Sequence, residues 1–425
     1  FTLLADVQGN EVLGGITTSS LATAMGVQAA TAKRLAVAEI TTVVVTSTIT
    51  GLMPTVVYVC NRYYGQLVNN NVLFIVPQVL CWLIGIIWCM MLIYIYPLMV
   101  TYELSYKGVL RNAARSRDTL LPPADLATKY SHPASLVALL KSYVGENRLE
   151  NMLKANNAAP DTVIQVNTLK TTAAKLLLRL EAEGVEARPH GWMENCLVLK
   201  NTGALEKLPS FCDGEFYVQD AAAKLAVDCA EIFEGDFLVT DCCAAPGGKS
   251  FAAAMALGGR GRIVSSDVYE HKVPLMEKGA QRLGFANMHP RHFDATVFDP
   301  ELEGRVDFAL VDVPCSGYGI IRKKPDIREK DPDTMKELPK LQLQILQNQA
   351  RYVRPGGVLL YSTCTLVREE NEGVVERFLK ENPQYSLEPL PLPDVFPKNE
   401  SGMLALVPGE YDTDGFFICR MRRKA

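Results

Sequence analysis

The sequence predicts an α/β protein with a Rossmann-like, doubly wound parallel sheet, preceded by a small α/β module and a hydrophobic helical N-terminal segment. Three observations support this prediction. The 425 residues are 48% hydrophobic and 21% charged, yet the first 100 hold only six charged side chains. From residue 214 onward, short apolar strands alternate with helical patterns, as in α/β proteins. Polar and small-residue motifs follow several of these strands, where sheets of this kind bind ligands.

The composition excludes a disordered, collagen-like or coiled-coil chain, because apolar content is high, glycine is not periodic and no heptad array occurs. The net charge of −4 gives no general attraction to nucleic acid, so such a partner would need a local basic patch. The eleven cysteines include no C-x-x-C pair, which favours a reducing compartment. We expect four parts, of which the second is a linker with a remnant helix: residues 1–105, 106–125, 126–212 and 213–425.

The charge-poor first part predicts membrane-spanning helices. Residues 72–100 are uncharged and apolar, and about 20 apolar residues suffice to cross a bilayer. Residues 40–61 form a weaker candidate that is rich in threonine, and the alternative for both is a buried core helix. Basic residues such as Lys107 and Arg111 follow the stronger span, which by the positive-inside rule places the remainder in the cytoplasm. We therefore expect a cytoplasmic catalytic part and membrane association through residues 40–100.

Fragments of this first part resemble small bacterial membrane proteins. Residues 24–30, followed by residues 41–50, resemble the YoaK-like family, and residues 94–103 resemble the YesL-like family. Neither resemblance implies an activity.

The two α/β parts are predicted from periodicity. After a linker at residues 120–125, the small module should contain helices at residues 133–155 and 172–184 and strands at residues 162–169, around Ala187 and at 196–199. In the larger part the expected strands are residues 237–241, 262–267, 308–313 and 358–362, and the expected helices are residues 249–257, 271–283, 333–352 and 369–381. This alternation predicts a parallel sheet with its ligands at the carboxyl ends of the strands.

A glycine-rich loop follows the first of these strands. Its glycines let backbone N–H groups approach a ligand closely, and the helix that begins there favours a negative group. A phosphate-binding P-loop would need glycine in place of Cys243 and cannot use the N–H that Pro246 lacks. The alternatives are therefore S-adenosyl-L-methionine and, less favoured, a nucleotide whose magnesium Asp312 would bind. The loop consists of Cys243, Ala244, Ala245, Pro246, Gly247, Gly248 and Lys249.

Two further carboxylates favour S-adenosylmethionine. Asp267 ends the second strand, 26 residues after Asp241, at about the spacing of a ribose-binding acid in a Rossmann-like unit. Asp294 lies in a later loop that is expected to face adenine. Each carboxylate alone could simply cap a helix, but their order along the chain favours the cofactor site.

Two cysteines follow the remaining strands. Cys315 comes just after Asp312 in an Asp-Val-Pro-Cys-Ser-Gly loop, and Cys364 lies in a Ser-Thr-Cys-Thr turn. A lone cysteine is usually a small core residue. Because both should lie at one edge of the sheet and face one crevice, the pair indicates nucleophiles. No histidine neighbours either cysteine, so we expect no metal.

These loops, at residues 243–249, 312–317 and 361–365, resemble the signature loops of the RNA cytosine-C5 methyltransferases of the Nol1/Nop2/Sun family, nearest the bacterial RsmB/Sun type that acts on 16S ribosomal RNA. The resemblance covers residues 107–425. Supporting matches are Lys129–Pro133, Val218–Asp220, Arg322–Arg328, Glu369–Glu372 and Asp414–Phe417.

The resemblance implies a mechanism and a set of roles. Cys364 would add to C6 of the base, Cys315 would assist its release, and Asp312 would protonate or hydrogen-bond N3. The loop of residues 243–249 would bind S-adenosylmethionine together with Asp267, Asp294 and Asp312. Ribosomal RNA would be the partner of a monomeric enzyme.

A basic run beside the second cysteine loop is the expected RNA contact, with a solvated charged face as the alternative. The run consists of Arg322, Lys323, Lys324 and Arg328; Lys154, Lys170 and Lys175 are weaker candidates.

Two departures from the family pattern affect RNA binding more than chemistry. A NusB-like helical domain normally precedes the catalytic part, whereas only its last helix is expected here, at residues 107–117. Gln165 also stands where the family usually has arginine. A membrane protein with a non-catalytic RNA-binding module is the remaining alternative.

Overall fold

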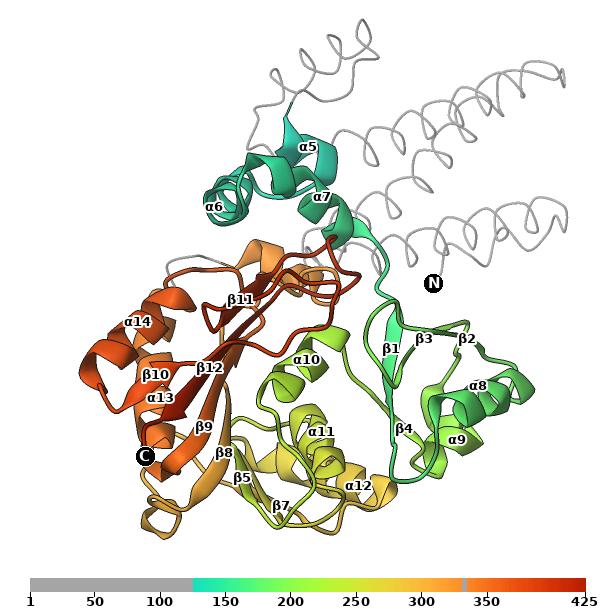
Figure 1. Cartoon of the computed structure of the whole chain (residues 1–425). Helices are drawn as coiled ribbons and strands as arrows, with labels where there is room; N and C mark the ends of the chain where they lie inside the picture. The colour runs from blue at the N-terminus through green and yellow to red at the C-terminus, as the bar shows by residue number, and fades with distance from the viewer. Residues whose placement is uncertain (1–124, 331–334) are drawn as a thin grey trace, which may run out of the picture. The chain divides into compact units, whose positions relative to one another are not determined.

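Two sheets organise the part of the chain that the computed structural model describes, which is residues 125–330 and 335–425 (Figure 1). The expected segment 1–105, with both candidate spans and the helix at residues 107–117, lies outside these ranges. Within them, no helix is long and apolar enough to cross a membrane.

The larger sheet has a parallel centre. Its strand order is β10-β12-β9-β8-β5-β6-β7, with β11 paired to β12. Strands β5 to β9 are mutually parallel, whereas β12 runs antiparallel to β9. The predicted Rossmann-like class is therefore confirmed. The strands are β5 (Leu238–Asp241), β6 (Arg262–Asp267), β7 (Met288–His292), β8 (Val306–Asp312), β9 (Val353–Thr363), β10 (Tyr385–Leu387), β11 (Met403–Leu406) and β12 (Phe416–Arg423).

Helices cover both faces of this sheet because its strands bury side chains on both sides. Along β8, Phe308 and Leu310 join one hydrophobic cluster, whereas Ala309 and Val311 join a second cluster. The first cluster includes side chains of α10 (Ala221–Cys229), α11 (Gly248–Ala256) and α12 (Val273–Leu283). The second includes side chains of α13 (Leu338–Tyr352) and α14 (Glu372–Glu381).

The smaller sheet is antiparallel, in the order β2-β3-β1-β4. One face of β1 packs Ile164 and Val166 against the helices of the module, while Val163 belongs to the first cluster of the larger sheet. Strand β4 follows the boundary that the sequence suggested at residue 212, so the small sheet takes in residues on both sides of it. The elements are β1 (Thr162–Val166), α8 (Ala173–Ala182), β2 (Glu186–Pro189), β3 (Cys196–Lys200), α9 (Pro209–Cys212) and β4 (Phe216–Val218).

Three helices precede the small sheet. The single helix expected at residues 133–155 is wrong in one detail, since Gly145 has a φ of 79° and divides it in two. The helices are α5 (Leu126–Tyr130), α6 (Ala134–Val144) and α7 (Glu146–Asn157). Their buried leucines pack with Tyr318, Ile321 and Ile327, which follow Cys315 along the chain. This helical unit therefore supports the segment that leaves the cysteine loop.

Candidate active site

The glycine-rich loop between β5 and α11 is fastened to the neighbouring strand β6. The Ala244 N–H donates to the Ser266 carbonyl at 2.9 Å, and the Ala245 N–H donates to the Asp267 carboxylate at 3.2 Å. Gly247 has a φ of 112°, and a Cβ built there would lie 2.6 Å from the Phe251 ring. Only glycine fits this position, so the backbone at the N-terminus of α11 stays open to a ligand.

Two of the expected cofactor carboxylates meet at this edge of the sheet. Asp267 is 5% exposed, and its second oxygen accepts from the Tyr269 N–H at 3.0 Å. Phe293, just after β7, donates its N–H to the Asp267 carbonyl, which brings the neighbouring Asp294 to the same edge. The exposed Asp294 accepts from the N–H and hydroxyl of Thr296. Since a carboxylate has about four lone-pair sites, both residues keep acceptor capacity for hydroxyl or amino groups.

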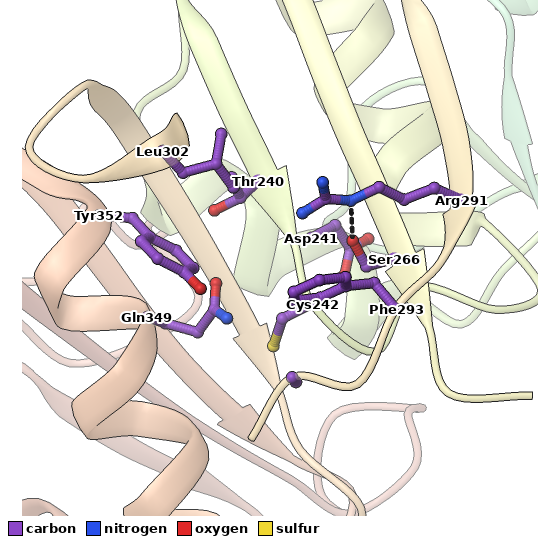
Figure 2. Close-up of a pocket in the computed structure, with 10 residues that line it drawn as sticks. Thr240, Asp241, Cys242, Ser266, Arg291, Phe293, Leu302, Gln349 and Tyr352 are labelled. Carbon is purple, nitrogen blue, oxygen red and sulfur yellow. Dashed lines mark hydrogen bonds between the residues drawn. The ribbon is translucent and has the colours of Figure 1, made fainter. Parts of the chain in front are cut away.

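Asp241 at the end of β5 is a buried carboxyl. Ser250 donates its hydroxyl to Asp241 at 2.7 Å, and burial raises the pKa of Asp241 to about 7. A small pocket beside Asp241 is lined by Thr240, Ser266 and Arg291, with side chains of α13 on its other side (Figure 2). It contains neither Cys315 nor Cys364, so this pocket is separate from the reacting groups.

The two predicted nucleophiles face each other. The sulfur atoms of Cys315 and Cys364 lie 3.1 Å apart, and both side chains are partly exposed. They are adjacent because β8 and β9 pair in parallel with Asp312 opposite Ser362. The neighbouring Cys364 sulfur and burial raise the pKa of the Cys315 thiol well above its usual value, so Cys315 retains its proton.

Asp312 and Lys249 connect the cysteines to the glycine-rich loop. The Lys249 ammonium lies 2.7 Å from the Asp312 carboxylate, which also accepts from the Ser362 hydroxyl at 2.8 Å. Burial alone would lower the pKa of Lys249, but the Asp312 charge outweighs it and the pKa is raised. Lys249 therefore stays cationic, and its charge interacts favourably with a Cys364 thiolate.

A buried pair that sequence reasoning missed holds the Cys315 loop. Gln342 donates to the Pro314 carbonyl at 2.9 Å and to the Glu370 carboxylate at 2.8 Å. The same Glu370 oxygen accepts from the Ser316 N–H at 2.9 Å. The peptide groups on both sides of Cys315 are thus anchored. Glu370 lies in the matched stretch 369–372, which is the signal that could have indicated it.

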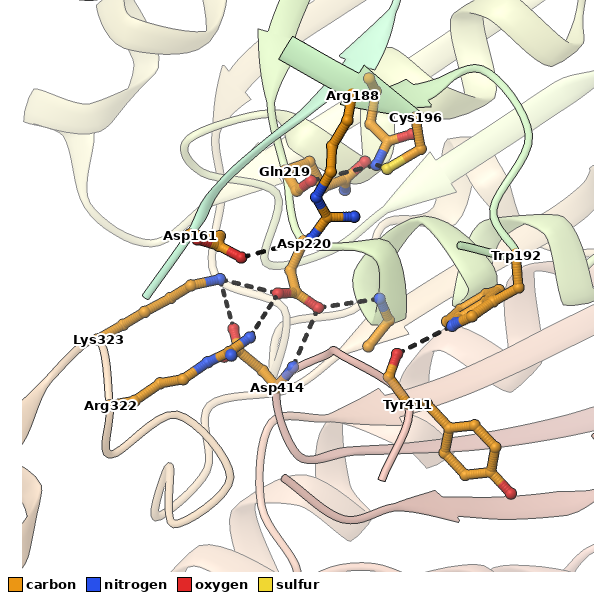
Figure 3. Close-up of polar contacts among 12 residues, drawn as sticks. Asp161, Arg188, Trp192, Cys196, Gln219, Asp220, Arg322, Lys323, Tyr411 and Asp414 are labelled. Atoms are coloured by element: carbon orange, nitrogen blue, oxygen red, sulfur yellow. Dashed lines mark hydrogen bonds and ion pairs between the residues drawn. The ribbon is translucent and has the colours of Figure 1, made fainter. Parts of the chain in front are cut away.

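Three of the four basic residues that were expected to contact RNA bind partners within the protein. Arg322 and Lys323 form ion pairs with Asp220 and Asp414, at 2.6 to 2.9 Å for the shorter contacts (Figure 3). The side chains of Asp220 and Asp414 are 9% and 5% exposed, so these pairs are structural.

The other two basic residues differ from each other. Arg328 donates to the Asn156 carbonyl and to the Asn157 side chain at the end of α7. Lys324 is exposed and makes no ion pair within the part that the structure describes. The weaker candidate Lys170 donates to the carbonyls of Asp213 and Arg282 and is likewise structural. Of the expected run, Lys324 alone has a side chain with no ion pair or hydrogen bond to the described residues.

Comparisons with known proteins point to one family. Residues 231–422 match the family described as 16S rRNA methyltransferase RsmB/F, and residues 132–206 match its ferredoxin-like domain. The probable ribosomal RNA small subunit methyltransferase B of Bacillus subtilis is 37% identical over 328 residues, which cover 75% of this chain and 73% of that protein. The chain belongs to the RsmB/F family of 16S rRNA methyltransferases.

Three further proteins are similar to this chain. Ribosomal RNA small subunit methyltransferase F of Salmonella paratyphi B is 35% identical over 274 residues, and the match spans 61% of this chain and just over half, 56%, of that relative. A methyltransferase homologue from Pyrococcus horikoshii has a TM-score of 0.60 at 27% identity and covers 72% of this chain and 100% of its own. The fold is shared with NSun6 from the same organism, solved with the cofactor analogue SFG (TM-score 0.59, 22% identity, 69% and 98% covered).

Family membership decides between the cofactors that the glycine-rich loop left open. S-adenosylmethionine is the cofactor of RsmB/F methyltransferases, and the nucleotide-hydrolase alternative is wrong. The residues fit this cofactor: the loop exposes its backbone at a helix N-terminus, and Asp267 lies at the end of β6. Residues 1–100 match a separate family of unknown function, DUF1275, which is consistent with the distinct resemblance of that segment.

Proposed function

We propose that the protein transfers a methyl group from S-adenosylmethionine to C5 of a cytosine in 16S ribosomal RNA, through a covalent bond between Cys364 and C6 of the base. The observation that supports this most is the 3.1 Å contact between Cys315 and Cys364, next to the Asp312–Lys249 ion pair. The matched family and the two bacterial relatives named above are described as ribosomal RNA methyltransferases; the position on the base and the covalent step are our proposal.

The chemistry needs a nucleophile because C5 of cytosine is itself a poor one. The Cys364 thiolate adds to C6, and the resulting enamine carries enough electron density at C5 to attack an electrophilic methyl group. S-adenosylmethionine supplies that methyl group as a sulfonium substituent. The Lys249 cation stabilises the thiolate before addition, while Cys315, which keeps its proton, donates a hydrogen bond to it.

Asp312 is placed to bind the polar edge of the base. Its carboxylate is fixed by Lys249 and Ser362, so its remaining lone pairs have a defined direction. A hydrogen bond from N3 to the Asp312 carboxylate favours the adduct in which N3 is protonated. Lys249, which pairs with Asp312, is the neighbouring group that carries a proton. This interaction at N3 stabilises the adduct that forms when Cys364 adds to C6.

The second half of the reaction restores the free enzyme. After transfer, a base removes the C5 proton, the C6–S bond breaks, and Cys364 leaves as a thiolate. We assign to Cys315 the role of assisting this elimination, because its sulfur lies beside the leaving sulfur and its loop is anchored by Glu370 and Gln342. A Cys315 variant should therefore stop at the adduct.

An RNA substrate fits this site because the base must leave its stack to meet two facing cysteines, and RNA loops present unstacked bases. We assign cofactor binding to the glycine-rich loop, Asp267 and Asp294, and phosphate binding to Lys324. The catalytic part would act in the cytoplasm, where ribosomal RNA is found. Membrane association through residues 40–100 and a monomeric state stay predictions.

The product of the reaction tests the proposal. The purified protein is incubated with 16S ribosomal RNA and methyl-labelled S-adenosylmethionine, and the RNA is digested to nucleosides for mass spectrometry. We expect label in 5-methylcytidine. Label in a ribose-methylated or N4-methylated nucleoside would overturn the assignment to C5 while leaving the family unchanged.

A further inference from the structure

Two consecutive residues just before α14, Glu370 and Asn371, each contact one of the two segments that carry the cysteines. Glu370 anchors the Cys315 loop, as described above. Asn371 is 1% exposed, and none of the roles above uses it. Its side chain binds residues 363–365, which we call the Cys364 turn. The same short stretch of chain therefore holds both cysteine-bearing segments.

Asn371 binds the residues on both sides of the expected nucleophile. The Thr363 hydroxyl donates to Asn371 Oδ1 at 2.6 Å, and Asn371 Nδ2 donates to the Thr365 carbonyl at 3.0 Å. A carbonyl can only accept, so the contact with Thr365 identifies the amide nitrogen and defines the orientation of the side chain. The Cys364 carbonyl itself accepts from the Gly319 N–H at 3.0 Å. Each of the three residues of the Cys364 turn is thus held by a hydrogen bond.

A further hydrogen bond joins the Cys364 turn to the Cys315 loop. The hydroxyl oxygens of Thr365 and Ser316 lie 2.7 Å apart, and both residues are fully buried. Burial makes the loss of either hydroxyl costly, because its partner would be left without a hydrogen bond. Since Thr365 follows Cys364 and Ser316 follows Cys315, this bond joins the two segments one residue beyond the sulfur atoms.

The pairing of β8 with β9 brings the two segments together but ends before the cysteines. The last pair of this ladder joins Asp312 with Ser362. Cys315 and Cys364 both lie beyond that pair, so the distance between their sulfur atoms depends on how the two segments are held past the end of the ladder.

We propose that Asn371 and Thr365 are positioning residues for the two cysteines. Asn371 holds the turn from which Cys364 attacks C6, and the Thr365 hydroxyl keeps Cys315 beside it for the elimination. The two residues therefore serve different steps: addition depends on Asn371, and release depends on Thr365. This inference rests on the roles proposed above for the two cysteines.

The release step is tested with a pair of variants at Thr365. Thr365→Val replaces the hydroxyl by a methyl group of similar size, while Thr365→Ser keeps the hydroxyl. With 16S ribosomal RNA and S-adenosylmethionine, kcat of Thr365→Val should fall about tenfold at an unchanged KM for RNA, and a protein–RNA adduct should accumulate on a denaturing gel. Thr365→Ser and the exposed Thr168→Val should behave as wild type. Equal losses in both Thr365 variants, or a slow Thr365→Val without an adduct, would overturn this role.

The addition step is tested in the Cys315→Ala background, where the adduct is expected to persist. Asn371→Leu has a side chain of similar size without polar groups, and it should slow adduct formation about tenfold. Thr363→Val removes only one of the two contacts of Asn371 and should act in the same direction, while Thr363→Ser should not. Urea unfolding identifies variants that fold. Adduct formation by Thr363→Val as fast as by Cys315→Ala alone would contradict the role of Asn371.

A dithiol reagent measures the position of the sulfur atoms without RNA or cofactor. Phenylarsine oxide condenses with two neighbouring thiols: two S–As bonds form, and the oxygen leaves as water with both thiol protons. In wild type it should bridge Cys315 and Cys364, as identified by peptide mass spectrometry. Thr365→Val should form this bridge more slowly and Thr365→Ser at the wild-type rate. Equal rates in all three proteins, or no bridge in wild type, would overturn the proposal. If this pattern holds but the RNA contains no 5-methylcytidine, only the proposed function fails.

Discussion

Burial of Asp241 makes its contribution to the free energy of unfolding depend on pH. Its pKa is raised to about 7 by burial, from an ordinary value near 4 in the unfolded chain. Below pH 4 both states are protonated. Between pH 4 and 7 the unfolded state ionises while the folded state keeps its proton, so the contribution of Asp241 to stability falls as pH rises.

Asp241→Asn removes this dependence because an amide does not ionise. Relative to the variant, wild type should lose up to about 1.4 kcal/mol of unfolding free energy for each pH unit between pH 4 and 7, and the difference should level off above pH 7. Urea unfolding at a series of pH values measures it, with the exposed Asp326→Asn as control. Parallel pH profiles for wild type and Asp241→Asn would contradict the assignment.

At the residue scale, sequence predicts the groups that lie within motifs and misses their partners. Cys315, Cys364 and Asp312 were predictable because each follows a strand directly. Gln342 was not, since it contacts the Cys315 loop across 28 residues of sequence. The ion pairs of Arg322 and Lys323 were not predictable for the same reason. A run of basic residues does not reveal Asp220 and Asp414, which lie about a hundred residues away on either side.

At the scale of elements, the segment after the cysteine loop contains cations that pair with buried carboxylates, such as Arg322, and one, Lys324, that makes no ion pair within the described residues. Arg322→Ala would leave the buried Asp414 with Lys323 alone and should destabilise the protein by about 3 kcal/mol. Lys324→Ala should leave stability unchanged but weaken RNA binding. It should also reduce the slope of the logarithm of the binding constant against the logarithm of salt concentration by about one. Urea unfolding and RNA binding at several salt concentrations measure the two effects. The opposite pattern, with Lys324 stabilising and Arg322 dispensable, would show that the wrong residue was assigned to RNA.

Elements with a strong pattern were predictable and short or irregular ones were not. Strands β5, β6, β8 and β9 carry apolar runs and were expected. Strand β7, with the sequence Met-His-Pro-Arg-His, has no such run and is defined by its pairing with β6. The break at Gly145 was also missed, because the helical periodicity continues on both sides of it.

At the scale of the whole described unit, the two sheets share a core. Val163 and Val198 of the small sheet lie in the same hydrophobic cluster as Leu225, Phe251 and Met276, which belong to the helices on one face of the large sheet. Asn167 adds a polar link, donating to the Leu283 carbonyl at the end of α12. The sheets should therefore open together as one cooperative unit.

Hydrogen exchange tests this cooperativity. In native-state exchange followed by mass spectrometry, β1 and β3 should be protected by the same opening free energy as β5 and β6. Peptides that cover residues 202–204, a mostly exposed segment that follows β3, serve as a rapidly exchanging reference. A separate, lower opening free energy for the small sheet would mean that it unfolds independently of the large sheet.

The covalent step is the central proposal, and trapping it tests the roles of the two cysteines most directly. Labelled 16S ribosomal RNA and S-adenosylmethionine are incubated with each variant and resolved on a denaturing gel. Cys315→Ala should accumulate a protein–RNA adduct, Cys364→Ala should form none and transfer no methyl group, and the exposed Cys212→Ala should behave as wild type. An adduct with Cys364→Ala but none with Cys315→Ala would contradict the assignment and exchange the two roles.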